Sequence, residues 1–240
     1  MPTNSRLLLS CEHGGNRVPP TYAGLFVGQQ SLLATHRGYD IGALRAARYL
    51  RMRLQAPLVA ATTTRLLVDL NRSPGHRQLF SEFTRGLDPE RRQEIIERHY
   101  RPYRDEVRAH IEAGIAAHGR VIHVSVHSFT PWSKAAARRC QVGLLYDPKR
   151  TAETEFCKTW QRALRVVEPA LIVRRNYPYR GVSDGLVTSL RKRFDPIQYV
   201  GIELEINQAL AQAGGKRWTD LLKALVATLP VPGEVDERPG

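Results

Sequence analysis

The sequence has few cysteines, and they lack a spacing that would suggest pairing. Its 240 residues include only Cys11, Cys140 and Cys157, and none of them belongs to a CxxC pair. An odd number of cysteines without this spacing is typical of neither a disulfide framework nor a cysteine-ligated zinc knuckle.

Long hydrophobic runs and low-complexity linkers are also absent. Residues 7–10 are too short for the apolar part of a secretory signal, and no apolar run reaches membrane-spanning length. We therefore expect a cytoplasmic protein without a membrane partner. The 42% of hydrophobic residues are enough for one sizeable core. The sequence predicts one domain over residues 1–240, with its core at about 6–229 and a frayed tail at 230–240.

Acidic residues are scarce relative to basic ones. The 23 Asp and Glu face 36 Lys and Arg, which gives a net charge of +13. Such an excess favours anionic partners, either nucleic acid or an acidic small molecule. The arginines, however, are spread over predicted helices at amphipathic spacing, with no basic tail and no aromatic–basic RNA motif. We interpret most of the excess as a solvated surface, which disfavours nucleic acid.

Runs of strand length alternate with stretches of helical periodicity along the chain. Predicted strands cover residues 6–10, 58–61, 65–69, 121–126, 141–146, 171–173 and 199–206. Predicted helices cover residues 41–54, 88–118 (broken or kinked at Pro102), 152–167 and 216–229. This alternation predicts an α/β fold in which helices cover both faces of a mostly parallel sheet.

Four ionisable residues, His13, Asp40, His127 and Glu205, fall at or near the ends of separate predicted elements. His127 ends a buried strand, where open α/β sheets bind ligands, although a lone histidine there is more often part of the core. Two glycines after His13 leave its imidazole accessible. Asp40 either caps a helix or points into a site. Two histidines and a carboxylate are the usual protein ligands of a hydrolytic zinc, and a further carboxylate can act as general base.

Other polar residues of the predicted strand ends have two interpretations each. Glu203 and Glu205 share one strand face, and because burying both unpaired would be costly, they must meet cations, a metal or solvent. The Asn71-Arg72 pair suits carboxylate binding, or Arg72 forms a loop-stabilising salt bridge with an aspartate. The aromatic, basic loop 174–185 suits a segment that covers a substrate, or is a solvated connection.

Seven motifs occur in an order that resembles the N-formylglutamate amidohydrolase family. They are LSCEHGGNRVP, DIGA, LLVDLNR, HYRPY, VSVHSFTP, NYPYRG and IELEIN, and they extend from about residue 7 to 210. The family is similar in fold to the zinc carboxypeptidases and to the deacylases that release aspartate or glutamate, such as aspartoacylase and succinylglutamate desuccinylase. The resemblance implies a three-layer α/β/α sandwich of the phosphorylase/hydrolase-like type, with zinc at the carboxyl edge of the sheet. It also implies hydrolysis of the N-acyl amide, first of all the N-formyl amide, of an acidic amino acid such as N-formylglutamate.

The resemblance implies a set of metal ligands. His13 and His127 match the two histidines of the family and would bind zinc. Zinc carboxypeptidases have a glutamate three residues after the first histidine, where this chain has Asn16. We therefore expect Asp40 to be the third ligand, with Glu12 as the fallback. The metal could be zinc or another divalent ion such as cobalt or manganese.

The resemblance also implies catalytic and substrate-binding residues. Glu205 matches the last-strand glutamate that acts as general base, and Glu203, where better-known members are expected to have glutamine, takes a supporting role. Asn71 and Arg72 are similar to the carboxypeptidase pair that grips a substrate carboxylate. Candidates for a second anionic group of the substrate are Arg175, Asn176, Tyr179 and Arg180.

The chain departs from the family in its first motif, where Glu12-His13-Gly14-Gly15 stands in place of the frequent Pro-His-Ser-Gly. This marks a short, divergent member, whose substrate need not be N-formylglutamate itself. Two other functions stay open on the sequence. One is a catalytically inactive or differently specific anion-binding protein of the same fold, and the other is a basic nucleic-acid-binding protein.

Overall fold

The computed structural model describes residues 7–132 and 137–230, and within them six strands form one sheet in the order β2-β1-β3-β6-β4-β5. Residue 6 of the first predicted strand and residues 231–240 of the predicted tail lie outside the described residues. The strands are β1 (Leu7–Cys11), β2 (Leu58–Ala60), β3 (Val121–Phe129), β4 (Val142–Leu145), β5 (Val173–Arg175) and β6 (Tyr199–Asn207).

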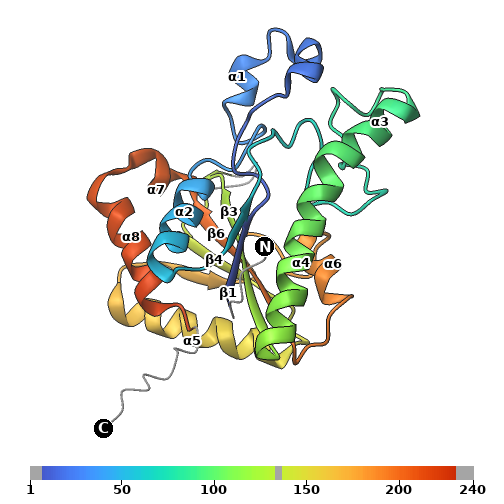
Figure 1. Cartoon of the computed structure of the whole chain (residues 1–240). Helices are drawn as coiled ribbons and strands as arrows, with labels where there is room; N and C mark the ends of the chain where they lie inside the picture. Colours follow the sequence, from blue (N-terminus) through green and yellow to red (C-terminus); the bar gives the residue numbers. More distant parts are fainter. Residues whose placement is uncertain (1–6, 133–136, 231–240) are drawn as a thin grey trace.

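Helices cover both faces of this sheet, so that the molecule has three layers (Figure 1). On one face lie α2 (Ala43–Leu54), α5 (Thr151–Val167) and α8 (Gly215–Thr228), and on the other lie α4 (Arg101–His118) and α6 (Leu186–Arg191). The remaining helices are η1 (Pro20–Phe26), α1 (Gln30–Leu33), α3 (Pro89–Ile95), η2 (Ile96–Tyr100) and α7 (Gln208–Ala213). No helix of the described segments combines the length and the apolar character that crossing a membrane requires.

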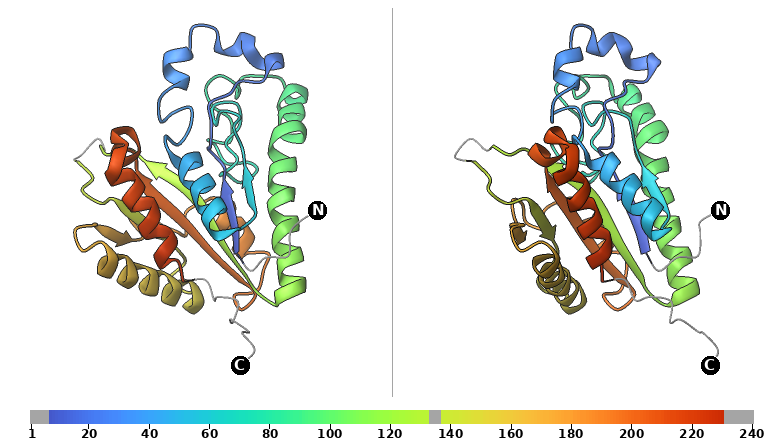
Figure 2. Two further views of the ribbon diagram at one scale, coloured as in Figure 1. Left: turned by 60° about the vertical axis from the view of Figure 1, so that its left-hand side comes forward. Right: turned by 90° about the vertical axis from the view of Figure 1, so that its left-hand side faces the viewer.

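The sheet is mostly parallel, as predicted. β2, β1, β3 and β6 run in the same direction, β4 runs antiparallel to β6, and β5 runs parallel to β4. Both views of Figure 2 show the sheet between its two helical layers. The prediction of an α/β fold with helices on both faces is confirmed. The carboxyl ends of β1, β3 and β6 therefore meet along one edge of the sheet.

One predicted strand, at residues 65–69, is wrong. The segment forms a turn, in which the Leu67 N–H donates to the Thr64 carbonyl at 3.0 Å. Because of this turn, Arg65 reaches the carboxylate of Asp69, four residues later, at 3.1 Å. In an extended strand the two residues would stand about 13 Å apart.

The long helix predicted over residues 88–118 is present as three successive segments, α3, η2 and α4. It begins where Asp88 Oδ1 accepts a hydrogen bond from the N–H of Arg91 at 2.8 Å, and it ends at Gly119, which has a φ of 73°. Pro102 does not break it. Just before that proline the helix widens to a π turn, in which the Arg101 N–H bonds back to the Ile96 carbonyl.

The two faces of the sheet differ sharply in polarity. On the face toward α2, α5 and α8, alternate strand residues are aliphatic and form the larger hydrophobic core. On the face toward α4 and α6, most of the other residues of β1, β3 and β6 carry hydroxyl, imidazole or carboxylate groups and are buried, whereas Leu8 and Val121 are apolar. The residues of this polar face are Ser10, Glu12, His123, Ser125, His127, Tyr199, Glu203 and Glu205.

His123 is the centre of the part of the polar face farthest from the sheet's carboxyl edge. Its ring is fully buried, with Nδ1 at 2.8 Å from the Tyr199 hydroxyl and Nε2 at 2.8 Å from Ser10 Oγ. Burial lowers the pKa of His123 to about 4, so the ring is neutral at physiological pH.

The depressed pKa of His123 makes stability depend on pH in a defined direction. Above pH 6.5 the ring is neutral in both the folded and the unfolded chain, whereas below this value the unfolded chain binds the proton first. Between about pH 7.5 and pH 5, we expect this residue to lower the free energy of unfolding by about 2 kcal/mol. Urea unfolding of the wild type and of His123→Gln at both pH values measures it.

The substituted protein should lose this part of the pH dependence, whatever its absolute stability. His36→Gln is the matched control, because His36 is exposed. An unchanged difference between the two pH values in His123→Gln would show that His123 is not held neutral by the fold.

Candidate metal centre

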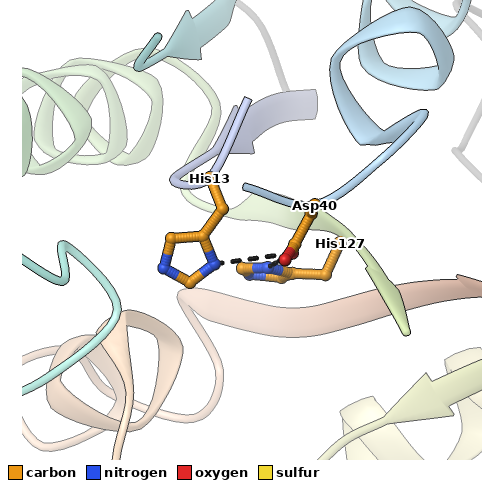
Figure 3. Close-up of side chains that lie close together, drawn as sticks. All are labelled: His13, Asp40 and His127. Carbon is orange, nitrogen blue, oxygen red and sulfur yellow. Dashed lines mark hydrogen bonds and ion pairs between the residues drawn. The ribbon is translucent and has the colours of Figure 1, made fainter. Parts of the chain in front are cut away.

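His13, Asp40 and His127 come together from three distant segments at the carboxyl edge of β1 and β3 (Figure 3). Asp40 Oδ2 lies 3.4 Å from His13 Nδ1 and 2.9 Å from His127 Nδ1. All three side chains are buried, and their donor atoms lie within 4.8 Å of one another. Two imidazoles and a carboxylate form a donor set that divalent transition metals accept, so this group could hold a metal ion.

The outer nitrogen of each imidazole is held by a second carboxylate. His13 Nε2 lies 2.7 Å from Asp69 Oδ1, and His127 Nε2 lies 2.8 Å from Glu12 Oε2. A ring that donates its Nε2–H in this way keeps the Nδ1 lone pair for a metal. The Nδ1 atom of His13 is buried and has no hydrogen-bond partner. This unpartnered acceptor fits a metal ligand.

Asp40 does not cap a helix. Gly42, with a φ of 88°, takes the N-cap position of α2, and the carboxylate of Asp40 turns toward the two histidines instead. Its other oxygen, Oδ1, accepts from Arg65 at 3.0 Å. Burial would raise the pKa of Asp40, but the neighbouring His13, His127 and Arg65 hold it well below its usual range.

Glu12, the fallback ligand, lies on the far side of the His127 ring. It contacts Nε2, whereas Asp40 contacts Nδ1 of the same imidazole. Both oxygens of Glu12 are already occupied by donors from Ser10, Ser125 and Tyr103. The geometry therefore favours Asp40 over Glu12 as the third ligand.

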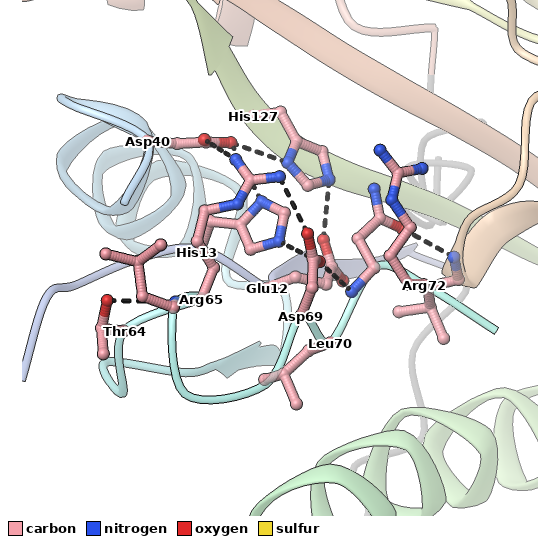
Figure 4. A network of polar contacts seen from close by, with 12 residues as sticks. Glu12, His13, Asp40, Thr64, Arg65, Asp69, Leu70, Arg72 and His127 are labelled. Carbon is pink, nitrogen blue, oxygen red and sulfur yellow. Dashed lines mark hydrogen bonds and ion pairs between the residues drawn. The ribbon is translucent and has the colours of Figure 1, made fainter. Parts of the chain in front are cut away.

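Two residues of the site, Arg65 and Asp69, were not predicted. Asp69 accepts from His13 and from the backbone N–H of Asn71 at 2.9 Å, and Arg65 joins Asp69 to Asp40 (Figure 4). The spacing of four residues between Arg65 and Asp69 was the feature of the sequence that could have indicated this ion pair. A segment interpreted as a strand conceals it, since side chains four apart meet only in a helix or turn.

Asn71 and Arg72 lie next to this network but are tied to the loop before α6. Asn71 Oδ1 accepts from the Leu186 N–H at 2.6 Å, and Arg72 Nη1 donates to the backbone carbonyl of Asp184 at 2.8 Å. The predicted alternative of an Arg72–aspartate salt bridge is not formed among the described residues. The Nε atom of Arg72 is buried without a partner, which leaves a donor for an anion.

Glu203 and Glu205 lie on the polar face of β6, opposite Ser125 and His127 of β3. Glu205 Oε2 is buried and has no hydrogen-bond partner. Burial raises the pKa of Glu205 to about 8 and raises that of Glu203 as well. Carboxyl groups whose pKa is raised toward neutrality are suited to proton transfer.

Tyr179 of loop 174–185 is partly exposed. Partial burial raises its pKa, and the negative charges of Glu205 and Asp40 raise it further. Arg138, which the sequence did not single out, stacks over the ring of Tyr179 and lies 3.5 Å from its hydroxyl. Arg138 Nη1 also donates to the carbonyl and the hydroxyl of Thr130, and these contacts help to hold Arg138 beside Tyr179.

The other predicted residues of the loop are not brought to the metal group. Arg175 lies two residues after Val173, on the side of β5 that packs against α5, opposite the polar face. Asn176, with a φ of 48°, closes the loop by accepting from the N–H groups of Tyr146 and Gly181. Arg180 is exposed.

Comparisons with known proteins agree with this fold. Residues 5–211 match the family model of N-formylglutamate amidohydrolase. The structure is similar to that of a gene product from Agrobacterium tumefaciens, with a TM-score of 0.78 and 28% identity, over 93% of this chain and 88% of that one. It is also similar to N-formylglutamate amidohydrolase from Ralstonia eutropha, with a TM-score of 0.69 and 19% identity, over 93% of this chain and 91% of that one. No curated protein sequence matches the chain significantly.

Removal of either imidazole should abolish tight metal binding. We expect the wild type to bind one Zn²⁺ per chain. His13→Ala and His127→Ala should bind it at least roughly 100-fold more weakly, because losing a ligand costs more affinity than the 10–100-fold that is lost with a residue hydrogen-bonded to a ligand. Titration of metal-free protein in competition with a chromophoric chelator measures both affinities.

His36→Ala is the control for this titration, because it removes an exposed imidazole that is not one of the three proposed ligands. It should keep the wild-type affinity and stoichiometry. Retention of wild-type affinity by His127→Ala would exclude this group as the metal site.

Proposed function

The chain belongs to the N-formylglutamate amidohydrolase family, and we propose that it is a metal-dependent hydrolase that cleaves the N-acyl amide of an acidic amino acid, with N-formylglutamate as the first substrate to test. The observation that supports this most is the buried His13, Asp40 and His127 group beside the unpartnered carboxylate oxygen of Glu205. It combines a metal ligand set with a proton acceptor at one edge of the sheet.

His13 and His127, each through Nδ1, and Asp40, through Oδ2, would hold the metal ion. Zinc is our first choice because of this donor set, and cobalt and manganese are the alternatives. A bound divalent ion would polarise the acyl carbonyl and acidify a water molecule. Asp69 and Glu12 keep the two imidazoles oriented for this task.

Glu205 is the general base in this proposal. It lies opposite His127 in the β3–β6 register, and its free Oε2 can accept the proton of the attacking water. Without a bound cation, the pKa of Glu205 is about 8. A positive charge at the metal group would lower this pKa and favour the ionised carboxylate. The protonated carboxyl can then donate to the leaving amine. Glu203 supports it from the same face.

Arg72 and Asn71 would bind the carboxylate of the substrate. The unpartnered Nε of Arg72 and its guanidinium fork suit a carboxylate, and the link to Asp184 fixes its direction. A second carboxylate would meet Arg138 and Tyr179, which are stacked on each other. Two anchored carboxylates would hold the amide in a single orientation for attack.

Replacement of the proposed base should stop turnover without removing the metal. We expect Glu205→Gln to hydrolyse N-formylglutamate roughly 100-fold or more slowly than the wild type, because glutamine keeps the shape but cannot accept the proton. The kcat of the zinc-loaded proteins measures the effect, and metal analysis of the same samples checks occupancy.

Glu155→Gln controls for the loss of one negative charge, since Glu155 is exposed on α5. Near-wild-type kcat in Glu205→Gln would refute the general-base role. Absence of hydrolysis by the zinc-loaded wild type, across N-formyl and N-acetyl amino acids, would instead favour an inactive anion-binding protein.

Arg72→Lys tests the carboxylate anchor. Lysine keeps the charge but loses the planar fork, so we expect KM for N-formylglutamate to rise about 10-fold or more while kcat changes less. Arg77→Lys, at an exposed position five residues away, is the matched control. An unchanged KM in Arg72→Lys would mean that another residue holds the carboxylate.

A further inference from the structure

The carboxylate of Glu12 has an unusually complete set of hydrogen bonds for a side chain that is 1% exposed. Oε1 accepts from Ser10 Oγ at 2.7 Å and from the Tyr103 hydroxyl at 3.0 Å. Oε2 accepts from Ser125 Oγ at 2.6 Å and faces His127 Nε2 at 2.8 Å. Four donors from three elements fix the position of this carboxylate and keep it ionised.

The hydrogen bonds behind Glu12 can be assigned a single direction. Ser10 gives its only hydroxyl proton to Glu12, so it can only accept from His123 Nε2. With its proton on Nε2, the neutral ring of His123 accepts at Nδ1 from the Tyr199 hydroxyl. The buried chain therefore runs from Tyr199 through His123 and Ser10 to Glu12, with every proton pointing toward the carboxylate.

We propose that Glu12 is a positioning residue, which holds the proton of His127 on Nε2 so that Nδ1 faces the metal group. No other carboxylate lies at this nitrogen in the described part of the chain. Ser125 Oγ is also close to it, at 2.9 Å, but has already given its proton to Glu12. The proton on Nε2 thus has Glu12 as its strongest acceptor.

The adjacent residues Glu12 and His13 act on the metal group in different ways. His13 would bind the metal directly, and Glu12 acts on the other histidine, which is 115 positions later in the chain. The position of His13 relative to His127 is therefore tied to a single dipeptide at the end of β1. Asp69 plays the corresponding part for His13, at 2.7 Å from its Nε2.

The first test needs no variant of Glu12. Selective ¹⁵N labelling of histidine in the zinc-loaded wild type, with His127→Ala for assignment, reports which ring nitrogen carries the proton. We expect His127 to keep its proton on Nε2 and to bind the ion through Nδ1. Coordination through Nε2 would overturn the proposal, even if every variant of Glu12 failed to fold.

The second test is the affinity of Glu12→Gln for Zn²⁺ alone. Since a neutral amide holds the imidazole proton less strongly, we expect affinity to fall roughly 10–100-fold, with a shifted His127 Nε2–H signal. Ser125→Ala keeps the carboxylate and should stay within about threefold of the wild type. Equal losses in the two variants, or wild-type affinity and tautomer in Glu12→Gln, would contradict the role of Glu12.

Glu153→Gln is the matched control for neutralising a buried carboxylate. Glu153 is fully buried and paired with Arg191, and it makes no contact with the metal group. This variant should lower stability while leaving zinc affinity and the His127 tautomer unchanged. An effect on affinity equal to that of Glu12→Gln would reduce the proposal to a general loss of stability.

The proposal rests on metal binding by the His13, Asp40 and His127 group and not on the identity of the substrate. If the zinc-loaded wild type hydrolysed no N-acyl amino acid but Glu12→Gln still lost affinity and tautomer, the proposed reaction would fail and the role of Glu12 would stand. If hydrolysis occurred and Glu12→Gln bound zinc like the wild type, the reverse would hold.

Discussion

The carboxylate of Asp40 is the connection on which the rest of the site depends. One of its oxygens faces the Nδ1 atoms of both histidines, and the other accepts from Arg65. Arg65 also binds Asp69, and Asp69 binds the outer nitrogen of His13. The contacts form a closed ring of four residues from three loops of the sheet's carboxyl edge. Asp69 holds the outer nitrogen of His13, while Asp40 and Glu12 contact the two nitrogens of His127, so both imidazoles are oriented before any metal binds.

The sheet can hold such a polar site because its buried groups are almost all partnered. Leaving a buried donor or acceptor without a partner costs about 1–3 kcal/mol, so exceptions need a reason. In the described residues the exceptions include His13 Nδ1, Glu205 Oε2 and Arg72 Nε. These three atoms belong to a proposed metal ligand, the proposed base and the proposed carboxylate anchor. The other four such atoms of the described residues belong to Tyr22, Arg92, His110 and His118, outside the proposed site. Within the site, the unpartnered atoms are those that a metal, a water and a substrate would contact.

The sequence predicted the fold better than it predicted the contacts of the site. Periodicity located β3, β6 and the amphipathic helices, because burial on one face of an element leaves a local pattern. The turn at Arg65–Asp69 was missed, since its apolar residues resemble a strand while its charged pair closes a turn. The partners of the imidazoles were also hidden. Asp69 is 56 positions from His13, and no local pattern reports contacts at such separations.

Loop 174–185 shows a second reason why residue roles were harder to predict than residue types. Its composition suited anion binding, yet Asn176 uses its side chain to close the loop, and strand parity turns Arg175 toward α5. Composition gives the chemistry that a loop can offer, whereas backbone direction decides which side chains face the site. Arg138 is the opposite case. Its position in the sequence gave no sign of a role, and only its stacking against Tyr179 in the structure places it beside the loop.

The charges of the metal group explain how it can exist both with and without an ion. Burial would lower the pKa of His127, but its hydrogen bonds to Asp40 and Glu12 raise it well above the usual value. With both ring nitrogens facing carboxylates, the metal-free ring carries a positive charge. A divalent ion at Nδ1 would displace that proton, so that binding releases a proton and adds one positive charge to the group. Asp40 therefore faces a positive charge both with and without the ion.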